Sequence, residues 1–324
     1  MRRLLYVVAC MVVTVTGFAL PGRAPAETRG VGLLKQGVEF TVTNPAENGA
    51  THQIVGFRYD TFCNSPTAIL LMHGLSYTKE AWDFPGYSVA QKLAAAGYAV
   101  FAIDRLGYGE SKLANGYNVT FEAYSDMAHQ IVEQLRQQGF SHVVLGGHSA
   151  GAGETEYEAG VYGGVDAIMA LGWHHRPSNQ IGQDFFTGDN PRALQDSYEY
   201  FLGTPQHRAE MFYTATADPD VVEADTKAAV LTPSGEILSI GMQPSRFVVG
   251  NIKVPVFLQF SDGDRLFEPQ YADMHKGEFF NSPSVTVDMV PDAGHTFMLT
   301  KNGRIGADHM VDWLRKQQTT PSCR

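Results

Sequence analysis

Short apolar runs alternate with helical stretches along most of this chain, and this order is what most constrains its fold. Four such runs are "TAILLMHG" (67–74), "AVFAID" (99–104), "HVVLGG" (142–147) and "VDAIMALGW" (165–173). Runs without polar alternation are typical of strands that are covered on both faces. Helical stretches between them indicate parallel strands joined by crossover helices. We therefore predict an α/β fold with a doubly wound, mainly parallel sheet.

The same rhythm extends to both ends of the chain and is interrupted once. Two strand-like runs at 38–44 and 52–59 precede it, and strands at 254–260 and 285–290 with a helix at 305–316 close it. Between residues 174 and 251 no clear strand is found, and aromatic residues lie among helix-like stretches: Phe185, Phe186, Tyr198, Tyr200, Phe201, Phe212 and Tyr213. We interpret 27–173 and 252–324 as the core and 174–251 as a helical cap insertion over the strand ends. Its aromatics form a small core of their own or line a substrate cavity.

The first 26 residues have the layout of a secretory signal peptide. Arg2 and Arg3 precede an apolar stretch from Leu4 to Leu20, and Ala24-Pro25-Ala26 forms a small-residue cleavage site. The stretch is too short and too diluted by threonine and glycine for a membrane-spanning helix. We expect cleavage after Ala26, export to the periplasm or the medium, and no stable membrane anchor.

The remaining 298 residues are acidic. The leader carries three arginines and no acidic residue, so the net charge is −13 without it and −10 with it. An acidic surface argues against nucleic acid and anionic membranes as partners. Cys63 and Cys323 remain after cleavage, at no metal-ligand spacing, and an even cysteine count in an exported protein suggests a disulfide.

The segment "GGHSAG" (146–151) lies between an apolar run and a helical stretch. A serine at a sharp strand-to-helix turn exposes its Oγ above the sheet, and glycines keep side chains out of the turn. A serine hydroxyl also needs a base to take its proton and a third group to orient that base. The sequence therefore makes Ser149 a candidate nucleophile with partners to be found after later strands.

Those partners follow the last two predicted strands. His295 is the only one of the eleven histidines between the last strand and the terminal helix, so we take it as the base. Asp264 is the first choice of acid, ahead of Asp262 and Asp292, since Asp292 also fits a turn residue. We expect Ser149, Asp264 and His295 to form a catalytic triad.

Other residues near the predicted strand ends complete the candidate site. The Leu75 and Ala150 N–H groups are candidate donors to an oxyanion, and we expect His73 to position the loop of Leu75. Residues 173–175 (Trp173, His174 and His175) leave a strand end and either contact substrate or pack. The carboxylates of Glu154, Glu156 and Glu158 are expected to face solvent.

These motifs together resemble the α/β-hydrolase superfamily, whose marks occur here in order: "HGLSYTKEAW", "DRLGYGES", "GHSAG", "SDGDRLFEP" and "DAGHTF". The resemblance implies Ser149 as nucleophile, Asp264 as acid, His295 as base, and Leu75 and Ala150 as oxyanion donors. It also implies that "DRLGYGES" is a structural loop and that 174–251 is the cap. One departure is Ser261, where the family commonly has a glycine. The implied fold brings Cys63 and Cys323 to the same face, which leaves a disulfide between them and two free thiols as open alternatives.

The function expected from these residues is hydrolysis of a small-molecule or polymeric carboxylic ester, uncharged or apolar, by an exported serine hydrolase. No cofactor and no metal are implied. The alternatives are a lactonase or an amidase or peptidase with the same triad, a C–C bond hydrolase, and a non-catalytic module that binds an apolar ligand under the cap.

Overall fold

The computed structural model describes residues 33–61, 64–176, 199–201 and 205–317. The predicted signal peptide, Cys63, Cys323 and the aromatics at 185, 186 and 198 lie outside these ranges. Within them, every helix is too short or too polar to cross a bilayer.

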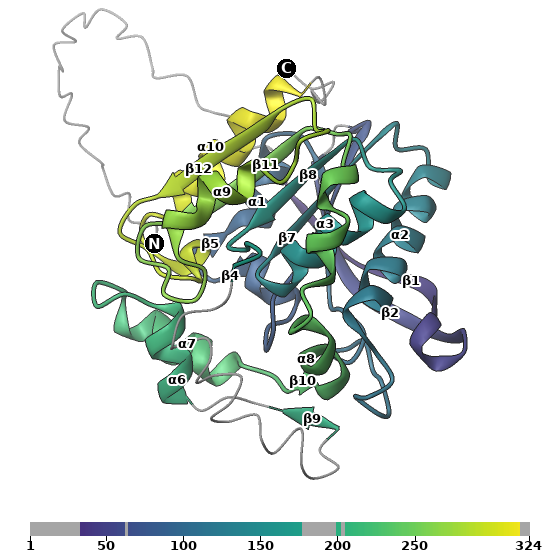
Figure 1. Ribbon diagram of the computed structural model, residues 1–324, viewed down its shortest axis with the longest axis horizontal. Coiled ribbons are helices and arrows are strands. Elements are labelled where there is room, and N and C mark those ends of the chain that lie inside the picture. The colour runs from purple at the N-terminus through teal and green to yellow at the C-terminus, as the bar shows by residue number, and fades with distance from the viewer. Residues whose placement is uncertain (1–32, 62–63, 177–198, 202–204, 318–324) are drawn as a thin grey trace, which may run out of the picture. The chain divides into compact units, whose positions relative to one another are not determined.

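An eight-stranded sheet forms the centre of this part of the chain, in the order β1-β2-β6-β3-β7-β8-β11-β12 (Figure 1). β1 and β2 form an antiparallel hairpin and β2 pairs antiparallel with β6, whereas all pairs from β6 to β12 are parallel. The predicted mainly parallel α/β fold is therefore confirmed. The strands are β1 (Leu34–Asn44), β2 (Ala50–Asp60), β3 (Thr67–Met72), β6 (Ala99–Ile103), β7 (His142–His148), β8 (Ala167–Leu171), β11 (Val256–Ser261) and β12 (Val285–Val290).

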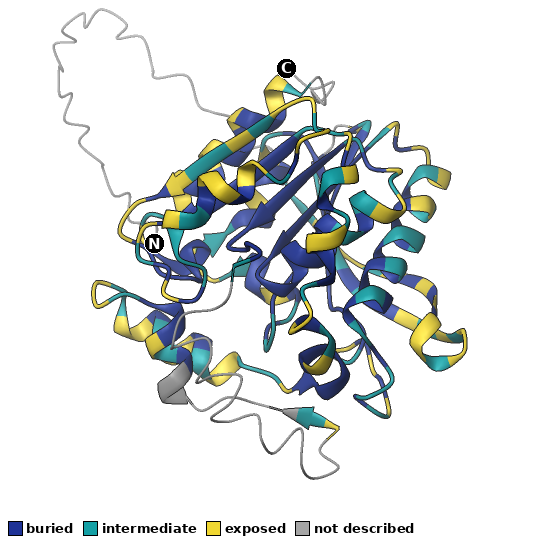
Figure 2. Cartoon of the chain, viewed as in Figure 1, coloured by how far each residue is buried: buried dark blue, intermediate teal, exposed yellow. Residues whose placement is uncertain are grey.

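Helices cover both faces of the sheet, as the apolar strands require. Alternate side chains of β3 enter two different cores: Leu70 packs with α2 (Phe121–Gln137) and α3 (Ala150–Val161), and Leu71 packs with α1 (Val89–Ala95) and α10 (Gly303–Lys316). β3, β6, β8 and β11 are buried over their whole length. Figure 2 shows the same pattern, with buried strands inside and exposed residues on the outer helices.

The stretch at 269–280, between β11 and β12, is helical only in part. It begins with the 3-10 turn η5 (Pro269–Tyr271), continues as α9 (Ala272–Lys276) and ends at Gly277. This short helix brings His275 into the core, where the side chain is buried.

The described part of the insertion adds no strand to the main sheet. It contains α6 (Pro205–Phe212), α7 (Pro219–Ala228), α8 (Ser234–Ile240), the 3-10 turns η3 (Pro244–Phe247) and η4 (Val249–Asn251), and a two-residue pairing of β9 (Tyr200–Phe201) with β10 (Thr232–Pro233). Helix-like stretches without a long strand were expected here. The assignment of 174–251 as a cap over the site stays a prediction.

Helix α3 begins close against the end of β3, which requires a residue without a side chain. A Cβ atom at Gly151 would lie 2.6 Å from the carbonyl oxygen of Met72 and 2.7 Å from that of His73. Backbone atoms cannot move aside as a flexible side chain can, so this contact sets the distance between the loop of Ser149 and the loop after β3.

We expect Gly151→Ala to lower the free energy of unfolding by about 1–3 kcal/mol, because the added methyl group forces these backbone segments apart. The matched control is Gly37→Ala, at an exposed position of β1, where a Cβ would meet nothing within 4 Å. Urea denaturation of both variants measures the difference, and equal midpoints would contradict the close approach.

Candidate active site

Ser149 lies at a strained turn between β7 and α3. Its backbone adopts φ 56° and ψ −123°, which is rare for a residue with a side chain. Its N–H donates to the carbonyl oxygen of Leu171 at 2.8 Å. A Cβ at Gly74 would lie 2.8 Å from the Cβ of Ser149, so the serine side chain lies against the loop after β3. The turn therefore presents the hydroxyl at the edge where the parallel strands end.

His295 and Asp264 meet at the same edge, in the loops after β12 and β11. Nδ1 of His295 lies 2.8 Å from Oδ2 of Asp264, and both side chains are completely buried. The other oxygen, Oδ1, accepts the N–H groups of Leu266 and Phe267, each at 2.8 Å. These three contacts hold the carboxylate in place and direct the opposite edge of the imidazole, with Nε2, away from the aspartate.

The other two candidate acids are engaged elsewhere. Asp262 accepts a long contact of 3.4 Å from the Ala293 N–H. Asp292, at a φ of 49°, accepts the hydroxyl of Thr216 at 2.8 Å in an exposed position. Of the three carboxylates that the sequence left open, the structure brings only Asp264 to His295.

Nε2 of His295 is buried and has no hydrogen-bond partner among the described residues. A Cβ at Gly172 would lie 3.3 Å from Cε1 of the His295 ring. The residue before Gly172 is Leu171, whose carbonyl oxygen accepts the Ser149 N–H. Ser149 and His295 therefore lie close to the same short segment, without a direct hydrogen bond between them. Catalytic hydrogen bonds are often long without substrate and tighten in the complex, so this geometry is compatible with proton transfer.

Two further histidines border the site and are held neutral. Nε2 of His148 donates to the carbonyl oxygen of His295 at 2.9 Å, and burial holds the pKa of His148 well below its usual range. His73 accepts the Arg105 N–H at Nε2 (3.1 Å) and donates from Nδ1 to the Gly74 carbonyl (2.8 Å), and burial likewise lowers its pKa. His73 thus holds the loop of Leu75 in position, as expected, and neither ring is free to act as a base.

The two expected oxyanion donors lie beside the serine. Ala150 is the first residue of α3, where helical N–H groups have no partner within the helix. Leu75 follows the end of β3 in a turn, and its N–H has no hydrogen-bond acceptor among the described residues. Both groups are available to a ligand, and their role as oxyanion donors stays a prediction.

Comparison with known proteins identifies the family. The model of the alpha/beta hydrolase family matches residues 69–305. The chain belongs to the alpha/beta hydrolase family. No curated protein matches it significantly.

Solved structures of this family are similar in fold. A thermophilic esterase from Thermogutta terrifontis has a TM-score of 0.69 at 18% identity, over 86% of this chain and 99% of that one. A monoacylglycerol lipase from Paleococcus ferrophilus has a TM-score of 0.63 at 17% identity, over 88% and 99%. A bromoperoxidase from Bacillus anthracis has a TM-score of 0.63 at 17% identity, over 87% and 99%. Because these proteins carry different activities, the shared fold does not by itself set the reaction of this member.

Residues 173–175 lie in packed positions in this alpha/beta hydrolase. Trp173 contacts Phe267 with ring centroids 4.9 Å apart and is 2% exposed. His174 packs against Phe267 and Tyr271, and burial lowers its pKa to about 4. Phe267 in turn lies against the ring of His295. The side chains of Trp173 and His174 therefore pack against Phe267 in the interior. A contact of residues 173–175 with substrate stays a prediction.

The expectation that Glu154, Glu156 and Glu158 face solvent is wrong. All three side chains are completely buried. Glu158 accepts from His129 Nδ1 at 3.1 Å, and Glu156 lies between His175 and His275. The sequence contained no signal for these partners, because they come from distant segments that only the folded chain brings to α3.

Glu154 shares one arginine with a residue of the insertion. Nη1 of Arg105 lies 2.5 Å from Glu154 and 2.6 Å from Glu236 of α8, and Tyr108 also donates to Glu236. One guanidinium cannot balance two buried carboxylates. Burial raises the pKa of Glu154 well above its usual range, with the Arg105 charge opposing it and Glu236 reinforcing it. The raised pKa favours the protonated form of the Glu154 carboxyl.

We expect the stability difference between Glu154→Gln and the wild type to depend on pH. With a raised pKa the folded state binds more protons than the unfolded state, so the wild type loses stability as pH rises above about 4.5. A neutral amide has no proton to lose, so the variant gains on the wild type by up to about 1.4 kcal/mol per pH unit. Urea unfolding at pH 5, 7 and 9 measures this gain, and a constant difference would contradict a protonated Glu154.

Proposed function

We propose that this protein is an exported serine hydrolase that cleaves carboxylic esters of uncharged or apolar compounds. The observation that carries the proposal is the buried Asp264–His295 pair, whose Nε2 is left without a partner beside the strained turn of Ser149. A turn that costs free energy and a buried imidazole with one vacant nitrogen are both expected where a serine is to be activated. A module that only holds a ligand needs neither.

The reaction follows from these positions. Nε2 of His295 takes the proton of Ser149 as Oγ attacks the ester carbonyl, and Asp264 orients the ring and stabilises the imidazolium. The N–H groups of Leu75 and Ala150 donate to the oxyanion. His295 then returns the proton to the leaving alcohol, and water hydrolyses the acyl-enzyme with the same base. This sequence of steps uses side chains and water and needs no cofactor.

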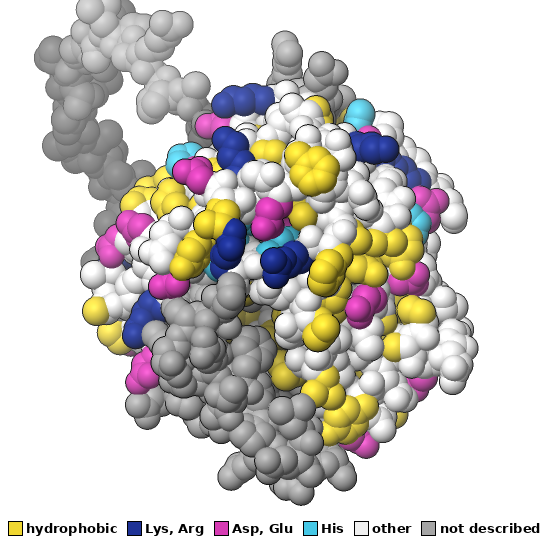
Figure 3. All heavy atoms as spheres, in the orientation of Figure 1, with side chains coloured by type: hydrophobic (Ala, Val, Ile, Leu, Met, Phe, Trp, Pro, Cys, Tyr) yellow, Lys and Arg dark blue, Asp and Glu magenta, His cyan; other side chains and the backbone are white. Residues whose placement is uncertain are grey.

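The surroundings of His295 favour an apolar acyl or alcohol group. The rings of Phe212 and Phe267 each lie 5.4 Å from the imidazole, measured between centroids. Phe212 ends α6 of the insertion and accepts the Thr296 N–H with its carbonyl, so the insertion contacts the base loop directly. On the face drawn in Figure 3, basic side chains lie among acidic ones, and neither charge dominates the described surface. The esterase and lipase with the same fold agree with an ester, and the leader at residues 1–26 supports export.

We expect a fluorophosphonate probe to add once to the wild type and not to Ser149→Ala. The probe reacts with a serine whose proton a neighbouring base removes. Intact mass spectrometry measures the adduct, and the hydrolysis of p-nitrophenyl butyrate measured in parallel should be lost in the same variant. Ser141→Ala, at an exposed serine before β7, is the control and should keep both. A folded wild type that neither reacts nor turns over would overturn the proposal.

We expect Asp264→Asn to lower kcat by about 10⁴-fold, because an amide at this position favours the wrong tautomer of His295. Asp262→Asn and Asp292→Asn are matched controls in neighbouring loops and should stay within a few fold of the wild type. Initial rates with p-nitrophenyl butyrate compare the three variants. A large loss in either control, with Asp264→Asn active, would move the role of acid to that residue.

A further inference from the structure

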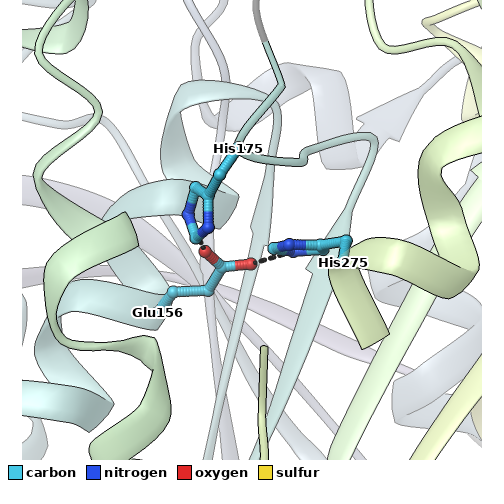
Figure 4. Close-up of side chains that lie close together, drawn as sticks. All are labelled: Glu156, His175 and His275. Carbon is cyan, nitrogen blue, oxygen red and sulfur yellow. Dashed lines mark hydrogen bonds and ion pairs between the residues drawn. The ribbon is translucent and has the colours of Figure 1, made fainter. Parts of the chain in front are cut away.

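A second group of ionisable side chains lies under the surface, apart from Ser149, Asp264 and His295. It consists of Glu156 of α3, His175 after β8 and His275 of α9, which we call the 156–175–275 cluster (Figure 4). One ligand atom from each residue lies within 4.8 Å of the others, and all three residues are buried. Among the described residues this is the one group of histidines and acids so close together.

The two imidazoles turn the same edge toward the carboxylate. Nε2 of His275 lies 2.8 Å from Oε1 of Glu156, and Nε2 of His175 lies 2.9 Å from Oε2, as Figure 4 shows. The ring planes are nearly perpendicular, at 89°. Two nitrogens and a carboxylate thus converge from three segments on one small volume.

A second carboxylate contacts the opposite edge of both rings, at Nδ1. Nδ1 of His175 and Nδ1 of His275 lie 2.6 Å and 2.9 Å from the same oxygen of Glu278. Histidines that bind metal almost always donate their other N–H to such an acceptor, which fixes the tautomer and leaves the facing nitrogen free to coordinate. By accepting the Nδ1–H of both histidines, Glu278 would leave both Nε2 atoms unprotonated and able to coordinate a metal ion.

One buried oxygen of the cluster is not satisfied by the protein. Oε2 of Glu156 is buried and receives no hydrogen bond of acceptable geometry from the described residues, although His175 Nε2 is near. Nε2 of His175 is aligned instead with Oγ of Ser245, at 2.7 Å. Buried carboxylate oxygens normally have a partner, and a cation between the two histidines would supply one here.

We propose that the 156–175–275 cluster binds a divalent transition-metal ion of the Zn²⁺ type, through Nε2 of both histidines and the Glu156 carboxylate, with Ser245 Oγ beside it. Imidazole and carboxylate are ligands that zinc accepts, and a 2+ ion balances the charges of Glu156 and Glu278. Bonds of about 2.0–2.2 Å place tetrahedral ligand atoms roughly 3.3 Å apart. The present separations of 2.7–2.9 Å must therefore open by a few tenths of an ångström.

The site would be structural and independent of the proposed ester hydrolysis. It joins α3, which follows Ser149, to the segment after Trp173 and to α9, beyond the loop of Asp264. An ion here stabilises the arrangement of three segments that carry or support the catalytic groups. Both histidines can instead hold two protons each and neutralise the carboxylates without an ion, and a binding experiment separates the two arrangements.

The test is Zn²⁺ binding by the purified full-length protein at pH 8, after chelator treatment. Equilibrium dialysis with metal analysis should give about one equivalent for the wild type and less than about a tenth for His175→Gln and His275→Gln. The matched control is His309→Gln, which removes an exposed histidine that also pairs with a carboxylate, at 2.8 Å from Asp288. This variant should bind as the wild type does.

Two further readouts keep the test decisive if the cluster variants fail to fold. Co²⁺ should give visible d–d bands of a nitrogen- and oxygen-coordinated site in the wild type and in His309→Gln. Saturating Zn²⁺ should raise the Tm of both by about 5 °C. A wild type that binds no ion, or binding unchanged in folded His175→Gln and His275→Gln, would overturn the site. None of these measurements depends on esterase activity, so a failed ester assay leaves the metal proposal standing, and the reverse also holds.

Discussion

The parallel strands from β3 to β12 all end at one edge of the sheet, and the candidate active site depends on this convergence. Ser149 follows β7, Asp264 follows β11, His295 follows β12, and the loop of Leu75 follows β3. Each group lies in a loop that directly follows a strand, so the sheet restricts the positions that the loop can adopt. The contact between Asp264 and His295 is the clearest result of that arrangement.

Around this edge, buried ionisable side chains connect segments whose register hydrophobic packing alone would determine less closely. Arg105 joins α3 to α8 of the insertion through Glu154 and Glu236. Glu156 joins α3 to the segment after β8 and to α9. Charged pairs in a dry interior gain little net stability, but removing one partner leaves the other unpaired at high cost. Helix α3, which directly follows Ser149, is thereby linked to three neighbouring segments.

Residues 205–251 contact the loops after β3 and β12 through particular side chains and one backbone carbonyl. Phe212 stacks on Tyr77 and lies against His295, and its carbonyl accepts the Thr296 N–H. Arg208 lies over the rings of Tyr77 and Phe212 and pairs with Asp225 of α7. The sequence left a separate core and a substrate lining open for these aromatics. Phe212 and Tyr213 are buried, and Phe212 also borders the base.

The sequence by itself determined the order of strands and helices, because hydrophobic periodicity and turn residues act over a few neighbouring positions. It also determined the chemical types after each strand, and hence Ser149, His295 and a choice among three aspartates. The tertiary structure decided which aspartate meets His295 and where Glu154, Glu156 and Glu158 point. The three glutamates looked solvent-exposed because charge usually indicates exposure. Their burial depends on Arg105, His129, His175 and His275. Only folding brings these partners within hydrogen-bonding distance of α3, and His275 lies 119 residues from Glu156 in the sequence.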